Sequence, residues 1–198
     1  MTVYDQTIEA FVAPLAEAGQ KAAVVACYHA VRNFDYLSDG VRDPQTVIDR
    51  QAGSCSGKHI VLRDCLVALG EKAWIETVEG DFAGGIPDHK TMPDELRSYA
   101  RDGGIRDFHQ FVVWDSGSDS CRLDATWPDQ LESFGFLVNK NWRGSGDTRL
   151  ALRPERYCGS TENIQHTKAE MIGSLTPVER DRREAFLEVL SRWLGSLR

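Results

Sequence analysis

One cysteine of this chain lies where a thiol could act as a nucleophile. Cys55 stands between Gly53 and Gly57, at the start of a helix that the apolar spacing predicts over 56–69. A free thiol has a pKa of about 8.5, but the unpaired N–H groups and positive dipole at a helix N-terminus favour the thiolate. Lys58 adds positive charge if its side chain bends back, and we expect the glycines to leave room for a substrate carbonyl.

A nucleophilic thiol also needs a base and a group that orients this base. His109 lies on a predicted strand over 108–114, and Asp124 lies on the next, over 121–126. The polar, turn-rich segment between these runs predicts a hairpin. Pairing the end of the first strand with the start of the second places Asp124 opposite Phe111, within reach of His109.

Each of these residues also has a reading without catalysis. Cys55 could be an inert loop thiol, His109 a core histidine and Asp124 the opening of a turn. His59, four residues after Cys55, is a rival base or half of a metal pair, although its place one turn into the helix directs it away from the open end. For an oxyanion hole, the Cys55 N–H and Gln51 are the candidate donors.

The elements that must position these residues predict an α+β fold. Its N-terminal helices and a central helix opened by the cysteine would pack on an antiparallel sheet, in one domain over 1–198 with a core at about 45–155. A capping box and Pro177 predict a C-terminal amphipathic helix over 177–197, and the broken segment over 80–107 predicts a long excursion. The other predicted helices are 8–15, 21–37, 45–49 and 94–101, and the other strands are 73–78 and 148–152.

Composition narrows the class of protein. The chain has 198 residues, 41% hydrophobic and 27% charged, which is typical of a folded domain. Its net charge of -7, with scattered basic residues, argues against a nucleic-acid partner. We find no signal peptide and no apolar run long enough for a membrane span. Five cysteines without paired spacing suggest reduced thiols and a cytoplasmic location, and no motif indicates a cofactor or a metal.

Three short segments in this order carry a family resemblance. The chain resembles the transglutaminase-like, papain-related core in the segments 53–58, 109–113 and 123–127, which together span about Arg50 to Trp127. The resemblance implies that Cys55 is the nucleophile, His109 its base and Asp124 the orienting acid. Two features depart from the family. It often has Trp where this chain has Phe111, and the excursion before His109 is long.

The chemistry expected from these residues is cofactor-free acyl transfer. Cys55 would attack a peptide-like amide, and the thioester would pass to water or an amine, with hydrolysis favoured because no acceptor site is visible. One alternative is an enzyme similar to arylamine N-acetyltransferases. That family usually has Arg-Gly-Gly before its cysteine, where this chain has Gln51-Ala52-Gly53. The other alternative is a non-catalytic binding module on the same fold.

Overall fold

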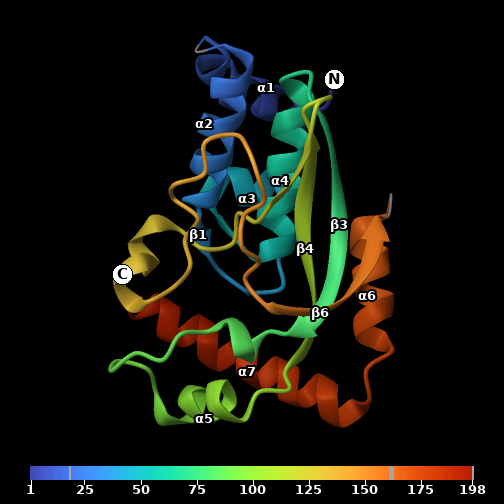
Figure 1. Ribbon diagram of the computed structural model, residues 1–198. Coiled ribbons are helices and arrows are strands. Elements are labelled where there is room, and N and C mark those ends of the chain that lie inside the picture. The colour runs from blue at the N-terminus through green and yellow to red at the C-terminus, as the bar shows by residue number, and fades with distance from the viewer. Residues whose placement is uncertain (18, 161–162, 198) are drawn as a thin grey trace.

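The computed structural model describes residues 1–17, 19–160 and 163–197, and these form an α+β fold with a four-stranded antiparallel sheet (Figure 1). The helices are α1 (Val3–Ala16), α2 (Gln20–Arg32), α3 (Pro44–Arg50), α4 (Cys55–Ala68), α5 (Asp94–Asp102), α6 (Ile164–Gly173) and α7 (Pro177–Gly195). The strands are β1 (Asp35–Tyr36), β2 (Ala52–Gly53), β3 (Lys72–Asp81), β4 (Arg106–Asp115), β5 (Ser120–Leu123) and β6 (Arg153–Ser160). Two 3₁₀ turns, Ala83–Gly85 and Asp129–Phe134, complete the description.

The central helix α4 is buried along most of its length. It packs against α1, α2 and α3 on one side and against β3 and β4 on the other (Figure 1). Apolar side chains of α4, among them Val61, Leu62 and Leu66, are fully enclosed in this cluster. Alternate side chains of β4 enter different clusters, because successive residues of a strand face opposite ways: Val112 joins α4, whereas Phe111 joins α7. The sheet therefore connects two apolar clusters.

The sheet has the order β5-β4-β3-β6. β4 and β5 form the predicted hairpin, and the pairing of Trp114 with Cys121 is confirmed. The strand predicted at 148–152 is wrong: that segment is a loop, and β6 follows it. β6 is a polar, mostly exposed edge strand whose register with β3 shifts twice, so it lacks the alternating apolar pattern of a half-buried strand.

Two helices differ from the prediction. The helix expected over 21–37 ends at Arg32, because Asp35–Tyr36 pairs with Ala52–Gly53 as a short parallel ladder and is therefore extended. α6 was not predicted at all. The C-terminal helix α7 is confirmed, with the capping box between Thr176 and Glu179 and an apolar stripe in the second cluster.

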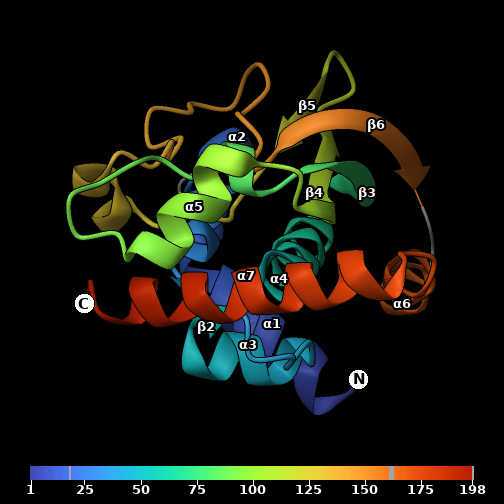
Figure 2. The same ribbon diagram turned by 90° about the horizontal axis from the view of Figure 1, so that it is seen from below.

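The long excursion between β3 and β4 is ordered around its apolar side chains. Phe82, Ile86, Met92 and Leu96 are buried in the cluster that α7 closes. α7 crosses the molecule beneath α4, as seen from below in Figure 2. In the part of the chain that the structure describes, no helix is both long enough and apolar enough to pass through a bilayer.

Candidate functional site

Cys55 is the first residue of α4, and Ser54 is the N-cap. The segment before it is held by the β1–β2 ladder, which ends with a hydrogen bond of 3.0 Å from the Leu37 N–H to the Gly53 carbonyl. Only 4% of Cys55 is exposed. The thiol therefore has a fixed position at the helix N-terminus, where N–H groups of the first turn lack partners within the helix.

The glycines on either side of Cys55 serve a different purpose from the one expected. A Cβ on Gly53 would meet the side chain of Val47 at 3.0 Å, and a Cβ on Gly57 would meet it at 2.8 Å. Val47 belongs to α3 and is completely buried. The close approach of α3 to α4 thus requires both glycines. This packing explains the glycines without any need to leave room for a substrate.

His109 and Asp124 lie together in the interior. Nε2 of His109 donates a hydrogen bond of 2.7 Å to Oδ2 of Asp124, and both residues are almost fully buried. His109 lies near the middle of β4, and Asp124 comes directly after the last residue of β5. The hairpin register explains the contact, because Leu123 pairs with Val112 and the next residue continues toward His109.

The carboxylate of Asp124 is held by the backbone on several sides. Its Oδ1 accepts from the Thr126 N–H at 2.9 Å, and its Oδ2 accepts from the Ala151 N–H at 2.7 Å. Thr148 accepts a hydrogen bond of 2.7 Å from the Asp124 N–H. Burial alone would raise the pKa of Asp124, but the charge and the hydrogen bond of His109 outweigh it and hold this pKa well below its usual range. Asp124 is therefore a rigid anion.

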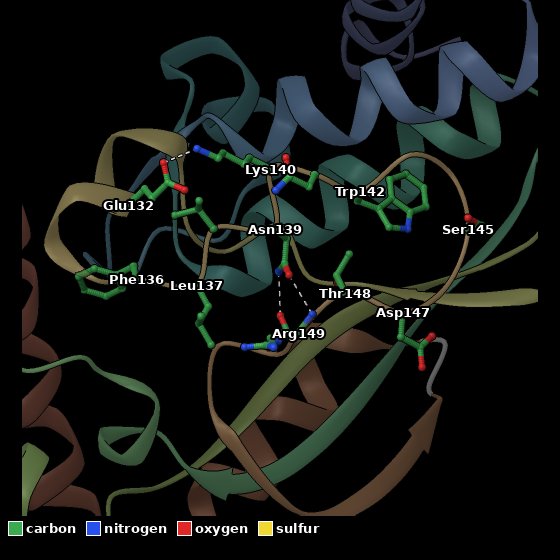
Figure 3. Close-up of a pocket in the computed structure, with 12 residues that line it drawn as sticks. Glu132, Phe136, Leu137, Asn139, Lys140, Trp142, Ser145, Asp147, Thr148 and Arg149 are labelled. Atoms are coloured by element: carbon green, nitrogen blue, oxygen red, sulfur yellow. Dashed lines mark hydrogen bonds and ion pairs between the residues drawn. The ribbon is translucent and has the colours of Figure 1, made fainter.

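Thr148 belongs to a loop that encloses a separate hollow of about 420 Å³ (Figure 3). In this loop the side chain of Asn139 exchanges two hydrogen bonds with the backbone of Arg149, at 2.9 and 3.0 Å. These two hydrogen bonds fix the backbone at Arg149, which lies between Thr148 and Ala151. The loop thus supports Asp124 from the side opposite the hairpin.

Cys55 and His109 lie close enough for each to shift the pKa of the other. Since Nε2 of His109 is bound to Asp124, the nitrogen left for the thiol is Nδ1. Burial raises the pKa of Cys55, but the positive charges of Lys168 and His109 outweigh it and lower the value to about 5. Burial lowers the pKa of His109, but Asp124 and Cys55 outweigh it and raise the value to about 10. A thiolate beside an imidazolium is the state that this arrangement favours at neutral pH.

Lys168 on α6 is a member of the site that the sequence analysis missed. Its Nζ lies 3.8 Å from the Cys55 sulfur and donates a hydrogen bond of 3.0 Å to Oγ of Ser56. The side chain is 4% exposed. No motif or spacing relates a lysine to a cysteine 113 positions earlier, so only the folded structure could identify it.

A second charge pair lies beside the thiol. Arg183 of α7 donates from Nε to Oδ1 of Asp107 at 2.7 Å, and both side chains are buried. Burial raises the pKa of Asp107, but Lys168 and then Arg183 outweigh it and lower this pKa. With Tyr36 and Leu187, these residues border a cavity of about 30 Å³ that reaches Cys55. α6 and α7 thus cover the Cys55 thiol.

His59 has a structural place in the interior. Its Nε2 accepts a hydrogen bond of 2.8 Å from the Ala125 N–H, so the lone pair of this nitrogen is occupied and is not available to take a proton from Cys55. His59, His109 and Asp124 are the one group within the described residues whose donor atoms are close enough to hold a metal ion. Nε2 of each histidine and both oxygens of Asp124 are already in hydrogen bonds, which a metal would have to replace.

Lys58 and the candidate oxyanion donor Gln51 both lie away from the Cys55 thiol. Nζ of Lys58 does not bend back to Cys55 but donates to the carbonyls of Arg32, Phe34 and Thr126, at 2.7–2.9 Å. Gln51 ends α3 in the left-handed conformation, with φ of 49°, and is exposed. It does not border the cavity at Cys55.

In comparisons with known proteins, no family model, no curated protein and no solved structure matches this chain.

Proposed function

We propose that this chain is a cysteine-dependent acyl-transfer enzyme with a transglutaminase-like core, in which Cys55 is the nucleophile, His109 the acid and base, and Asp124 the orienting group. The observation that carries the proposal is the hydrogen bond of 2.7 Å from His109 to the buried carboxylate of Asp124, with His109 close enough to Cys55 to lower the pKa of its thiol. This is the order of groups that nucleophilic catalysis by a thiol needs.

The proposed reaction has two halves. The Cys55 thiolate attacks the carbonyl carbon of an amide, a C–S bond forms, and the carbonyl electron pair moves to oxygen. When this pair returns, the C–N bond breaks, and the amine leaves with a proton from His109. In the second half, His109 takes a proton from water, the hydroxide attacks the thioester, and the acid and the thiolate are released.

Hydrolysis of a peptide-like bond is the second half that we favour. The cavity of about 30 Å³ beside Cys55 has the volume of one water molecule in the liquid. No acceptor site for an amine is identified among the residues that border this cavity. One alternative follows from the same enclosure: a thiol that is 4% exposed also suits a non-catalytic binding module on this fold.

Acylation of the intact protein tests the proposal. We expect p-nitrophenyl acetate to place one acetyl group on the wild-type chain, detected by intact mass spectrometry, and then to be hydrolysed. Cys55→Ala should take up no acetyl group at this rate. His109→Asn should be acylated more slowly near neutral pH, on the order of tenfold, because it loses one of the charges that ionise the thiol. The p-nitrophenolate group needs no proton to leave.

Cys158→Ala is the matched control, since Cys158 is a partly exposed cysteine on β6, away from the site. This variant should be acylated like the wild type. If Cys55 reacts no faster than Cys158 near neutral pH, or if His109→Asn reacts like the wild type, the chain is not this enzyme and the binding module is the better reading.

A further inference from the structure

The charge of Lys168 helps to lower the pKa of Asp107, but that carboxylate is bound by Arg183. No ion pair joins Lys168 to an acidic side chain among residues 1–17, 19–160 and 163–197. Its nitrogen instead contacts Oγ of Ser56 and the sulfur of Cys55. Burying an ammonium group is costly unless an anion or several hydrogen bonds compensate for it. The nearest group that could supply this anion is the Cys55 thiolate.

The remaining charges of the site are already paired. The imidazolium of His109 faces the carboxylate of Asp124 at 2.7 Å, and Arg183 faces Asp107 at 2.7 Å. The charge that changes place during acyl transfer is therefore the one beside Lys168. It lies on sulfur before the attack and on the substrate oxygen after it.

The distances allow Lys168 to bind this charge both on the sulfur and on the substrate oxygen. The oxyanion that forms lies two bonds from Sγ, so a cation 3.8 Å from the sulfur can reach the roughly 2.7–3.1 Å separation at which oxyanion donors act. Its hydrogen bond to Ser56, in the first turn of α4, holds the ammonium group on the same side as the first-turn N–H groups. Gln51, one candidate donor from the sequence, is exposed and is not at the cavity.

From this geometry we infer that Lys168 is a catalytic residue that donates a hydrogen bond to the oxyanion of the tetrahedral intermediate, together with the Cys55 N–H. This inference rests on the proposed function. As the C–S bond forms, Lys168 loses the thiolate as its counter-ion and gains the oxyanion. When the intermediate collapses to the thioester, the carbonyl oxygen keeps the hydrogen bond but not the charge. Lys168 keeps its proton throughout.

Two reagents separate this role from simple stabilisation of the thiolate. Iodoacetamide reacts at a saturated carbon and forms no oxyanion, whereas p-nitrophenyl acetate passes through one. Each rate is divided by the fraction of Cys55 present as thiolate, measured from thiolate absorbance in each variant. For Lys168→Met we expect alkylation per thiolate within about threefold of wild type, and acylation per thiolate slower by about 10²–10³.

Three further variants complete the test. Lys168→Arg should keep acylation within about tenfold of wild type, because it retains a buried cation. Lys168→Gln retains a neutral donor, so its rate of acylation per thiolate should lie between those of the Arg and Met variants. This variant keeps the test valid if circular dichroism shows that Lys168→Met does not fold. Lys72→Met, which changes an exposed lysine paired with Asp115, should leave both rates unchanged.

The results that would overturn the inference differ from those that would overturn the proposed function. Should Lys168→Met and Lys168→Gln lower both rates per thiolate equally, or lower neither, Lys168 is not an oxyanion donor. If wild-type Cys55 takes up no acetyl group, the proposed enzyme fails before any Lys168 variant is compared.

Discussion

Among single residues, the electrostatic partners of Cys55 determine when the thiol is reactive. His109 and Lys168 both lie beside the sulfur, and Asp124 keeps His109 charged. The positive charges surround the thiol from β4 and α6, so its ionisation does not depend on the helix N-terminus alone. Removing any one of them should therefore raise the pKa of the thiol without returning it fully to its ordinary value.

The pH dependence of acylation follows from these groups. The pKa of Cys55 is lowered to about 5, so the thiolate disappears below that pH. The pKa of His109 is raised to about 10, so the proton for the leaving group disappears above it. We expect acylation by an amide to be bell-shaped, with a plateau between these values, measured as acetyl incorporation against pH.

The control for this profile is His109→Asn, in which the acid limb should move to higher pH because one of the two cations is lost. Cys121 provides an internal comparison, since burial raises the pKa of that thiol. A wild-type acid limb near the pKa of a free thiol would show that Cys55 is not ionised by its neighbours.

The residues of the candidate site were accessible to sequence analysis to different degrees. Cys55, His109 and Asp124 could be brought together because a helix start and a hairpin register are local patterns. Their catalytic assignment stays a prediction. Lys168 and Arg183 could not be found in this way, because their approach to Cys55 depends on how α6 and α7 pack and not on spacing along the chain.

At the level of elements, the contact between α3 and α4 fixes where Cys55 lies. Val47 of α3 lies against Gly53 and Gly57, one before and one after Cys55. β-branched Val47 has few alternative rotamers, so it cannot easily move aside. The entry into α4 is therefore set by packing between two helices.

Gly57→Ala tests this contact. The added methyl would lie 2.8 Å from Val47, and overpacking of about 1–3 kcal/mol should exceed the helix-propensity gain of up to about 1 kcal/mol. We expect net destabilisation of about 1–2 kcal/mol in urea unfolding. The matched control is Gly173→Ala in α6, where a Cβ meets nothing within 4 Å. It should stabilise the protein by up to about 1 kcal/mol.

In a Val47→Ala background the sign should reverse. With the valine methyls gone, Gly57→Ala should become neutral or stabilising, because only the propensity gain remains. Equal effects of Gly57→Ala in both backgrounds would mean that Val47 does not restrict this position.

Elements with strong local patterns were predicted well, and those without them were not. α7 has a capping box and an apolar stripe, and β4 and β5 are rich in β-branched and aromatic residues. β6 is a polar edge strand that contains Pro154 and Gly159, and its place comes from pairing with β3. Such an element depends on its neighbour more than on its own sequence.

Considered as a whole molecule, the site is assembled from distant parts of the chain. α4, the β4–β5 hairpin, α6 and α7 each contribute a residue beside Cys55 or His109. Figure 2 shows α7 crossing beneath α4. The pair of Arg183 and Asp107 joins α7 to β4 at this crossing.

Arg183→Met should destabilise the whole fold. The substitution leaves the buried carboxylate of Asp107 without its guanidinium partner, which costs about 3–5 kcal/mol for a buried pair. Urea unfolding measures the loss. Adding Asp107→Asn should restore part of the stability, since the unpaired charge is then absent.

The control on the same helix turn is Arg182→Met, whose side chain is exposed and donates to the Gly103 carbonyl at 3.0 Å. It should cost less than about 1 kcal/mol. A similar loss of unfolding free energy in both arginine variants would show that the buried pair stabilises the packing of α7 no more than the exposed contact does.

The position of Lys168 has a consequence for biosynthesis. The ribosome adds 113 positions after Cys55 before this lysine exists, and Arg183 comes later still. A growing chain that already contains Cys55, His109 and Asp124 therefore lacks one of the two cations that ionise the sulfur, and it lacks the helices that cover it. Cys55 therefore gains its second neighbouring cation at the same stage of synthesis at which α6 and α7 enclose it.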